Sequence, residues 1–214
     1  MDLAEFTDKF SKIILPQDTA EDWAASGMIN YYWNKYRFSA LQNPRRIAEI
    51  GVRAGYSAWA FLLAAPTADY IGFDPYLPVH GGFDGSLAKD GKAWAEQLIG
   101  VNGTTRSIVV KRSDEVKHID GRPDFVHVDG DHSHPGCASD MLLACNSLAP
   151  GGLVLIDDYS MITDVRHAVD EFIQLNVGFK SAALIEDIRG QVLLFDSILP
   201  DWVMTQFSGK RLPC

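Results

Sequence analysis

Residues 124–135 read DFVHVDGDHSHP and residues 151–159 read GGLVLIDDY, so two short apolar runs each end in a pair of acids. A helix-length segment at 135–148 separates the two runs. A strand, a crossover helix and a second strand make parallel neighbours, whose carboxyl ends lie on the same edge of a sheet. Open sheets of this kind bind ligands in the crevice outside that edge. This stretch therefore predicts an α/β protein with a ligand site at the carboxyl ends of its strands.

Four carboxylates follow the two predicted strands: Asp129 and Asp131 after the first, Asp157 and Asp158 after the second. Such a cluster is costly unless a cation lies among the acids. The alternative is that Asp157 and Asp158 only cap the helix that follows them, as acids at strand ends often do. Because two strand ends contribute acids, the pattern favours a metal site over capping alone.

The bulk composition indicates one globular protein that acts on a small molecule. The 214 residues suffice for one large domain with a sizeable core. The formal net charge of −9 and the lack of a Lys/Arg cluster argue against a nucleic-acid partner. The sequence has no run of 18 apolar residues, so we expect no membrane span. Its N-terminus carries acids and no long apolar run, which is not the pattern of a secretion signal. Three sparse cysteines indicate reduced thiols, so we expect a cytoplasmic protein.

The first 44 residues predict a helical cap in front of a domain at 45–214. Apolar spacing predicts a helix at 3–14, ended by Pro16, and a second helix at 20–38 that Gly27 interrupts. The second helix is rich in Trp, Tyr and Phe, which is more typical of a core or an interface than of a ligand site. Such a layer could still cover the mouth of the sheet, or pack in a homodimer.

Residues 46–57 read RIAEIGVRAGYS and predict a strand, a glycine-containing turn and a helix. This is the first half of a nucleotide-binding βαβ unit. The dinucleotide fingerprint needs a middle glycine so that the backbone can approach a pyrophosphate, and Arg53 stands there instead. That departure argues against NAD or FAD. With Glu49 at the strand end, the turn favours an amine-bearing ligand without a phosphate on the loop.

Polar residues also follow the second and third predicted strands, at 70–73 and 107–111. Asp74 lies 23 residues after Gly51, a spacing at which an acid accepts hydrogen bonds from ribose hydroxyls. The alternative for Asp74 is an ordinary turn residue before a proline. Ser113 and Asp114 follow the third strand, where they could bracket an adenine ring or cap the next turn.

The rest of the chain completes a doubly wound sheet. A long Gly- and Pro-rich loop at 75–91, which contains His80, predicts a lid or binding loop. Helices are predicted at 92–101 and 161–175, and alternating residues from 179 to 198 predict an antiparallel hairpin. The order is five βα units followed by a hairpin.

This order resembles the class I S-adenosylmethionine-dependent methyltransferases, whose Rossmann-like, mostly parallel seven-stranded sheet ends in an antiparallel hairpin strand. The resemblance covers about residues 45–198. It is carried by EIGVRAG at 49–55, Asp74, DGDH at 129–132 and PGG at 150–152. It implies S-adenosylmethionine as cofactor, with the following contact residues: Glu49, Gly51, Gly55, Tyr56 and Ser57 for the methionine part, Asp74 for the ribose, Ser113 and Asp114 beside the adenine, and Asp129.

Within that family, VDGDHS at 128–133 followed by a strand and an Asp pair is similar to the Mg²⁺-dependent small-molecule O-methyltransferases of the catechol, caffeoyl-coenzyme A and macrocin-like types. This implies Mg²⁺ or another divalent cation held by Asp129, Asp157 and Asp158, with Asp131 as the alternative to Asp129. Catechol-type enzymes have Asp-Asn at the pair, and their general-base Lys has no match near Asp131. His132 and Asp131 are therefore the candidate bases, with a supporting structural histidine as the alternative for His132.

The sequence leaves three functional hypotheses. The first is O-methylation of a small-molecule hydroxyl, in which a cation makes the hydroxyl more acidic and a base takes its proton. Methylation of an amine is a variant that needs no metal. The second is a nicotinamide-dependent oxidoreductase, and the third is a non-catalytic ligand-binding protein, because the fold alone does not guarantee methyl transfer. Cephalosporin-hydroxylase-like proteins share the same pattern.

Overall fold

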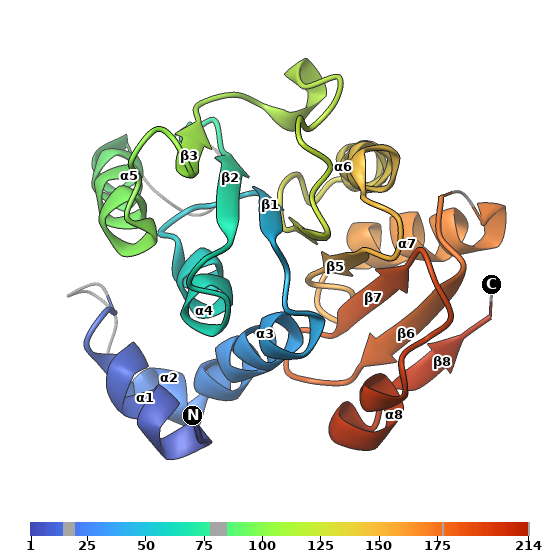
Figure 1. Ribbon diagram of the computed structural model, residues 1–214, viewed down its shortest axis with the longest axis horizontal. Helices are drawn as coiled ribbons and strands as arrows, with labels where there is room; N and C mark the ends of the chain where they lie inside the picture. The colour runs from blue at the N-terminus through green and yellow to red at the C-terminus, as the bar shows by residue number, and fades with distance from the viewer. Residues whose placement is uncertain (15–19, 78–84, 177, 214) are drawn as a thin grey trace.

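The computed structural model describes residues 1–14, 20–77, 85–176 and 178–213 (Figure 1). These residues form one eight-stranded sheet in the order β3-β2-β1-β4-β5-β7-β6-β8. Strands β3 to β5 in that order are parallel, and β7 lies antiparallel between β5 and β6. The strands are β1 (Arg46–Ile50), β2 (Asp69–Phe73), β3 (Arg106–Val109), β4 (Phe125–Val128), β5 (Leu153–Ile156), β6 (Ser181–Ile185), β7 (Gln191–Phe195) and β8 (Lys210–Leu212).

Helices cover both faces of the sheet (Figure 1). They are α1 (Leu3–Ser11), α2 (Ala20–Ala25), α3 (Met28–Gln42), α4 (Tyr56–Ala64), α5 (Gly85–Ile99), α6 (His134–Ser147), α7 (Thr163–Leu175) and α8 (Asp201–Phe207), with a 3₁₀ turn η1 (Ser113–Glu115). One apolar core joins α6 and α7 to the sheet, and a second joins α3, α4, α5 and α8 to the opposite face. With both faces covered, β4 and β5 are buried along their whole length, as parallel strands usually are.

The predicted fold class is confirmed, with differences at its ends. The sheet has eight strands because β8, which was not predicted, pairs with β6 at the edge. The helix expected at 20–38 is divided by Gly27, whose φ of 81° belongs to the left-handed region. Helix α5 begins at Gly85 rather than at residue 92, so Gly91 lies inside a helix, at a cost of about 1 kcal/mol relative to alanine. Pro16 and His80 lie outside the described residues.

The aromatic N-terminal layer is mainly core. Phe6 and Phe10 are fully buried and pack against aromatic rings from α3 and α4. The division into a cap at 1–44 and a domain at 45–214 stays a prediction. Across the described ranges, none of the helices has both the length and the apolarity that crossing a membrane requires.

Candidate functional site

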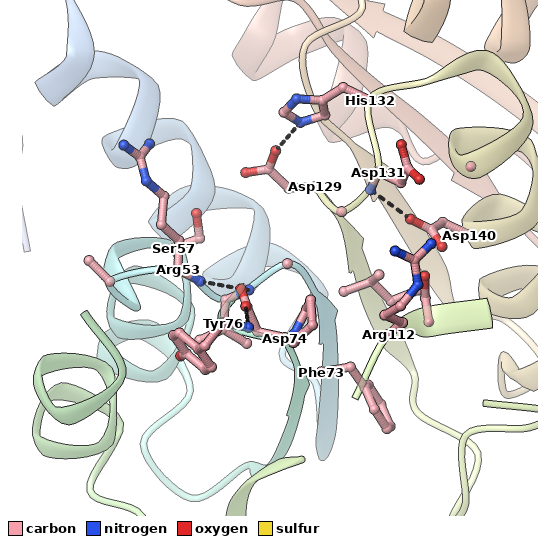
Figure 2. Close-up of a pocket in the computed structure, with 18 of the residues that line it drawn as sticks. Arg53, Ser57, Phe73, Asp74, Tyr76, Arg112, Asp129, Asp131, His132 and Asp140 are labelled. Atoms are coloured by element: carbon pink, nitrogen blue, oxygen red, sulfur yellow. Dashed lines mark hydrogen bonds and ion pairs between the residues drawn. The ribbon is translucent and has the colours of Figure 1, made fainter. Parts of the chain in front are cut away.

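A cavity of about 840 Å³ opens at the carboxyl ends of β1, β2 and β4 (Figure 2). The strand order reverses between β1 and β4, which is where open α/β sheets bind their ligands. Residues on its walls include Trp23, Tyr31 and Tyr32 from the N-terminal layer, residues 50–57, residues 73–77, residues 111–114, Asp129, Asp131, His132, Asp140 and Arg189.

The glycine turn after β1 needs its two predicted glycines. Gly51 has a φ of +87°, and a Cβ built on it would lie 1.9 Å from the carbonyl oxygen of Asp129. Gly55 has a φ of +80°, and its Cβ would lie 2.9 Å from the Cα of Ala95. The turn therefore presses against the end of β4 and against α5, and its backbone forms one wall of the cavity.

Asp74 fastens this turn. Its carboxylate accepts the N–H groups of Val52 at 3.0 Å, Arg53 at 2.8 Å and Tyr76 at 2.7 Å (Figure 2). Arg53 has a φ of 50°, so the residue at the missing glycine position does adopt a left-handed backbone. Asp74 lines the cavity as expected for a ribose contact, and it also holds the turn in shape. The ribose contact itself stays a prediction.

The cavity edge beyond β3 carries Ser113 and Asp114, in η1, together with Asp140 of α6. Asp114 is paired with Arg112 at 3.0 Å. Sequence analysis missed Asp140, which is 1% exposed and accepts the N–H of Asp131 at 3.1 Å. Burial raises the pKa of Asp140 to about 6.

The variant Asp140→Asn is expected to be more stable than the wild type at neutral pH. The folded-state pKa lies above the unfolded value of about 3.9, so the native state binds the extra proton and loses stability as the pH rises from about 4 to 6. The amide keeps the acceptor for the N–H of Asp131 without carrying a charge. Urea unfolding should give about 1–3 kcal/mol of added stability at pH 7.5 and no gain at pH 3.5. A loss of stability at both pH values would contradict this account.

Glu49 does not lie where a contact to the methionine part of the cofactor was expected. Its side chain is fully buried and is not on the cavity wall. It accepts a hydrogen bond from the Tyr70 hydroxyl, and its other oxygen lies 2.8 Å from Nδ1 of His127. Side chains alternate along a strand, and Glu49 faces the core under α3 and α4 while Ile50 lines the cavity. In this structure Glu49 therefore supports the floor of the site instead of reaching a ligand.

Below the floor lies a buried charge network that centres on one oxygen of Asp157. Oδ2 of Asp157 accepts hydrogen bonds from the Tyr31 hydroxyl and the Lys35 ammonium, and lies 2.8 Å from Nε2 of His127. All these side chains are at most 2% exposed. Two carboxylates, of Glu49 and Asp157, thus face two basic groups.

The network keeps Asp157 ionised. Burial alone would raise the pKa of Asp157, but Lys35 and His127 outweigh burial and lower it. Burial and Lys35 lower the pKa of His127, but the carboxylates of Asp157 and Glu49 prevail and raise it to about 9. Oδ2 of Asp157 has three hydrogen-bonding neighbours. Its other oxygen, Oδ1, is buried and has no hydrogen-bond partner among the described residues.

The structure places the predicted metal-binding acids near one another: Asp129 lines the cavity, and Asp157 and Asp158 are buried close to it. Two groups of three residues could each hold an ion: His127, Asp129 and Asp157 form the first, and Asp129, His132 and Asp158 form the second. Within each group, one ligand atom per residue lies within 4.8 Å of the others. Asp158 is 1% exposed and has a left-handed φ of 63°. Its Oδ1 accepts a hydrogen bond from Arg189 at 2.6 Å, and its buried Oδ2 has no hydrogen-bond partner among the residues that the structure describes.

Repulsion from the neighbouring acids affects the pKa of Asp158. Burial and the carboxylates of Asp129 and Asp157 raise the pKa of Asp158, although Arg189 opposes them. Two buried carboxylate oxygens without hydrogen-bond partners, one on Asp157 and one on Asp158, fit a cation placed between the strands.

The two candidate bases differ in their surroundings. Nε2 of His132 lies 3.2 Å from Asp129 and 3.4 Å from Asp158, and the side chain is 42% exposed (Figure 2). Oδ1 of Asp131 accepts the N–H of Ser133 at 2.9 Å at the start of α6. His132 is therefore directed at the other acids, while Asp131 shapes the turn. Their roles as base stay predictions.

Sequence analysis missed Tyr31, Lys35, His127 and Arg189. The signal for His127 was a polar residue inside an otherwise apolar strand, directly beside Glu49 in the parallel register of β1 and β4. Tyr31 and Lys35 are four residues apart on α3 and so share a face. Arg189 follows β6 in the hairpin, far from the site in sequence.

Comparison with known proteins identifies the family. A family model described as "Methyltransferase domain" matches residues 48–159, which are 112 of the 214 residues. No curated protein matches the chain.

Solved structures with the same fold include three O-methyltransferases. NovP is 14% identical with a TM-score of 0.62 (92% of this chain, 100% of that chain). TomG of Streptomyces achromogenes, involved in tomaymycin synthesis and solved with SAM, is 17% identical with a TM-score of 0.59 (91% and 98%). The O-methyltransferase from Bacillus cereus, solved with SAH, is 13% identical with a TM-score of 0.57 (91% and 99%). Because the family model matches more than half of the chain, this chain belongs to the methyltransferase domain family.

Proposed function

We propose that the protein transfers the methyl group of S-adenosylmethionine to a hydroxyl of a small molecule, with the help of a divalent cation. The observation that carries the proposal is the meeting of two half-sites in one cavity. The glycine turn fastened by Asp74 forms one wall, and Asp129 and Asp131 after β4 line the cavity next to it. Asp157 and Asp158 after β5 are buried, and each offers a ligand atom within 4.8 Å of one of Asp129.

The walls suit S-adenosylmethionine. The turn at 51–57 offers backbone at a point where a side chain on Gly51 would clash, and Asp74 lies beside it for the ribose. Ser113, Asp114 and Asp140 offer polar groups at the next strand end. Two of the three solved structures named above, those of TomG and of the Bacillus cereus O-methyltransferase, carry SAM or SAH in their descriptions, which supports the same ligand here.

The acids suit a divalent cation. Asp129, Asp157 and Asp158 would hold it, because two of them have buried oxygens without hydrogen-bond partners and the three together repel one another. When bound, a divalent cation acts as a Lewis acid that lowers the pKa of a hydroxyl beside it.

This chain's own residues would orient the acceptor. Trp23, Tyr31 and Tyr32 line the cavity on the side of the N-terminal layer, next to Asp129 and His132. They would exclude water and hold the acceptor so that its oxygen faces the sulfonium methyl, since methyl transfer needs the reacting atoms in line.

The test is methyl transfer from radiolabelled S-adenosylmethionine to a panel of catechols, phenols and sugars by metal-stripped protein, with Mg²⁺ or with chelator. Transfer is expected only with the cation. The pair Asp157→Asn and Asp158→Asn should lower the rate at least 100-fold, the scale for losing a major electrostatic contribution to the transition state. Asp120→Asn, which changes an exposed acid, is the control. Undiminished transfer in chelator would rule out the cation, and binding of NADH in place of S-adenosylmethionine would favour the oxidoreductase.

A further inference from the structure

His132 lies between two carboxylates. This position suits a metal ligand better than a general base. Its Nε2 lies 3.2 Å from Oδ1 of Asp129 and 3.4 Å from Oδ2 of Asp158. Nitrogen and oxygen ligands sit about 2.0–2.2 Å from a small divalent ion, so atoms that share one ion are separated by about 3–4 Å. Both distances from Nε2 therefore match those between ligands of one ion, and one ligand atom each of Asp129, His132 and Asp158 lies within 4.8 Å of the others.

A second observation points to an ion at this place. Asp158 is 1% exposed, and its Oδ2 has no hydrogen-bond partner. Arg189 holds the other oxygen at 2.6 Å. The anchored carboxylate thus keeps one buried oxygen free of hydrogen bonds, and that oxygen is the one nearest His132.

The backbone around His132 is fixed on both sides. The N–H of Asp129 donates to Ile50 at 2.8 Å, and the N–H of Asp131 donates to Asp140 at 3.1 Å. Ser133 caps α6 by accepting the N–H of Gly136 at 3.3 Å. Figure 2 shows the imidazole turned toward Asp129 over the cavity. These bonds fix the backbone from which the His132 side chain extends toward Asp129 and Asp158.

We propose that His132 is a nitrogen ligand of the cation, together with Asp129 and Asp158, and that it sets which metal the site takes. The inference rests on the cation of the proposed function. Carboxylates alone suit Mg²⁺, whereas an imidazole favours first-row transition ions such as Co²⁺ or Zn²⁺. A ring nitrogen that binds a metal is not available to accept a proton, so His132 is not the base.

The test is calorimetric titration of metal-stripped wild type, His132→Ala and His134→Ala with Mg²⁺ and with Co²⁺, combined with visible absorption of the bound Co²⁺. His134 is the matched control, since it is 40% exposed and pairs with Glu171 at 2.9 Å but does not line the cavity. S-adenosylmethionine is titrated into all three proteins.

We expect His132→Ala to weaken Co²⁺ binding at least roughly 10- to 100-fold. This is the loss of affinity seen when a residue that only hydrogen-bonds to a metal ligand is removed. Mg²⁺ binding should change far less, the Co²⁺ absorption bands should shift, and His134→Ala should match the wild type. Equal losses for both metals, or none, would overturn the proposal. If the wild type binds neither metal but binds S-adenosylmethionine, the proposals of a cation and of His132 as its ligand are wrong, while the proposal of methyl transfer is not affected. If it does not bind S-adenosylmethionine either, the proposed function fails as well.

Discussion

Replacing Lys35 with methionine should lower the free energy of unfolding by about 3–5 kcal/mol, the usual effect of removing one partner from a buried ion pair. Methionine fills nearly the same space, so packing changes little. The change leaves the buried carboxylates of Asp157 and Glu49 opposite a single cation, His127. The substitution also removes the cation–π interaction between the Lys35 ammonium and the Tyr31 ring, whose centre is 4.5 Å away. Urea unfolding at pH 7 measures the effect.

Two variants separate charge from packing. Lys12→Met removes a lysine that is 67% exposed, and should change stability by no more than about 0.5 kcal/mol. The double variant Lys35→Met with Asp157→Asn restores the balance of one carboxylate to one cation and should recover part of the loss. A single variant as stable as the wild type would show that the network does not carry the charges assigned to it.

Gly51→Ala should have the second large effect. Alanine at a φ of +87° costs about 1–2 kcal/mol in backbone strain. Its Cβ would also lie 1.9 Å from the backbone oxygen of Asp129, so the turn or the end of β4 must move. We expect a total loss of about 3–5 kcal/mol, at the upper end of single substitutions, together with loss of S-adenosylmethionine binding.

Gly103→Ala is the matched control for that experiment. Gly103 has a φ of +74°, and no atom of the described part of the chain lies within 4 Å of its added Cβ. It shares the backbone strain but lacks the contact, so it should lose only about 1–2 kcal/mol and keep the ligand. Equal losses for the two variants would mean that the close approach of the turn to β4 has no role.

Strand ends were the most predictable part of the site. Buried runs such as residues 125–128 and 153–156 have a clear apolar pattern, and parallel pairing brings the acids after them to one edge. Asp157 and Asp158 therefore each come close to Asp129, in two separate groups, and their binding of one cation stays a prediction. The first helical residues of α5 were not predictable, because glycines at 85 and 91 signal a loop locally while packing of the helix overrides that signal.

The charge network could not be read from the sequence. A strand buried on both faces gives no alternation, so nothing in residues 46–50 says which face Glu49 occupies. Lys35 lies on α3 and is separated from its partner His127 by 92 positions in the sequence. Only the packing of α3 over β1 and β4 brings the two together, and packing at that separation leaves no local pattern.

The most direct test of the central claim is the proton NMR line width of the sulfonium methyl of bound S-adenosylmethionine, with Mn²⁺ or Mg²⁺ added. The claim is that one cavity holds the methyl donor beside a cation at Asp129, Asp157 and Asp158. It predicts that Mn²⁺ broadens the methyl signal strongly in the wild type, that Mg²⁺ does not, and that Asp157→Asn with Asp158→Asn removes the broadening while the donor still binds. A sharp methyl signal from the wild-type complex in the presence of Mn²⁺ would contradict the account.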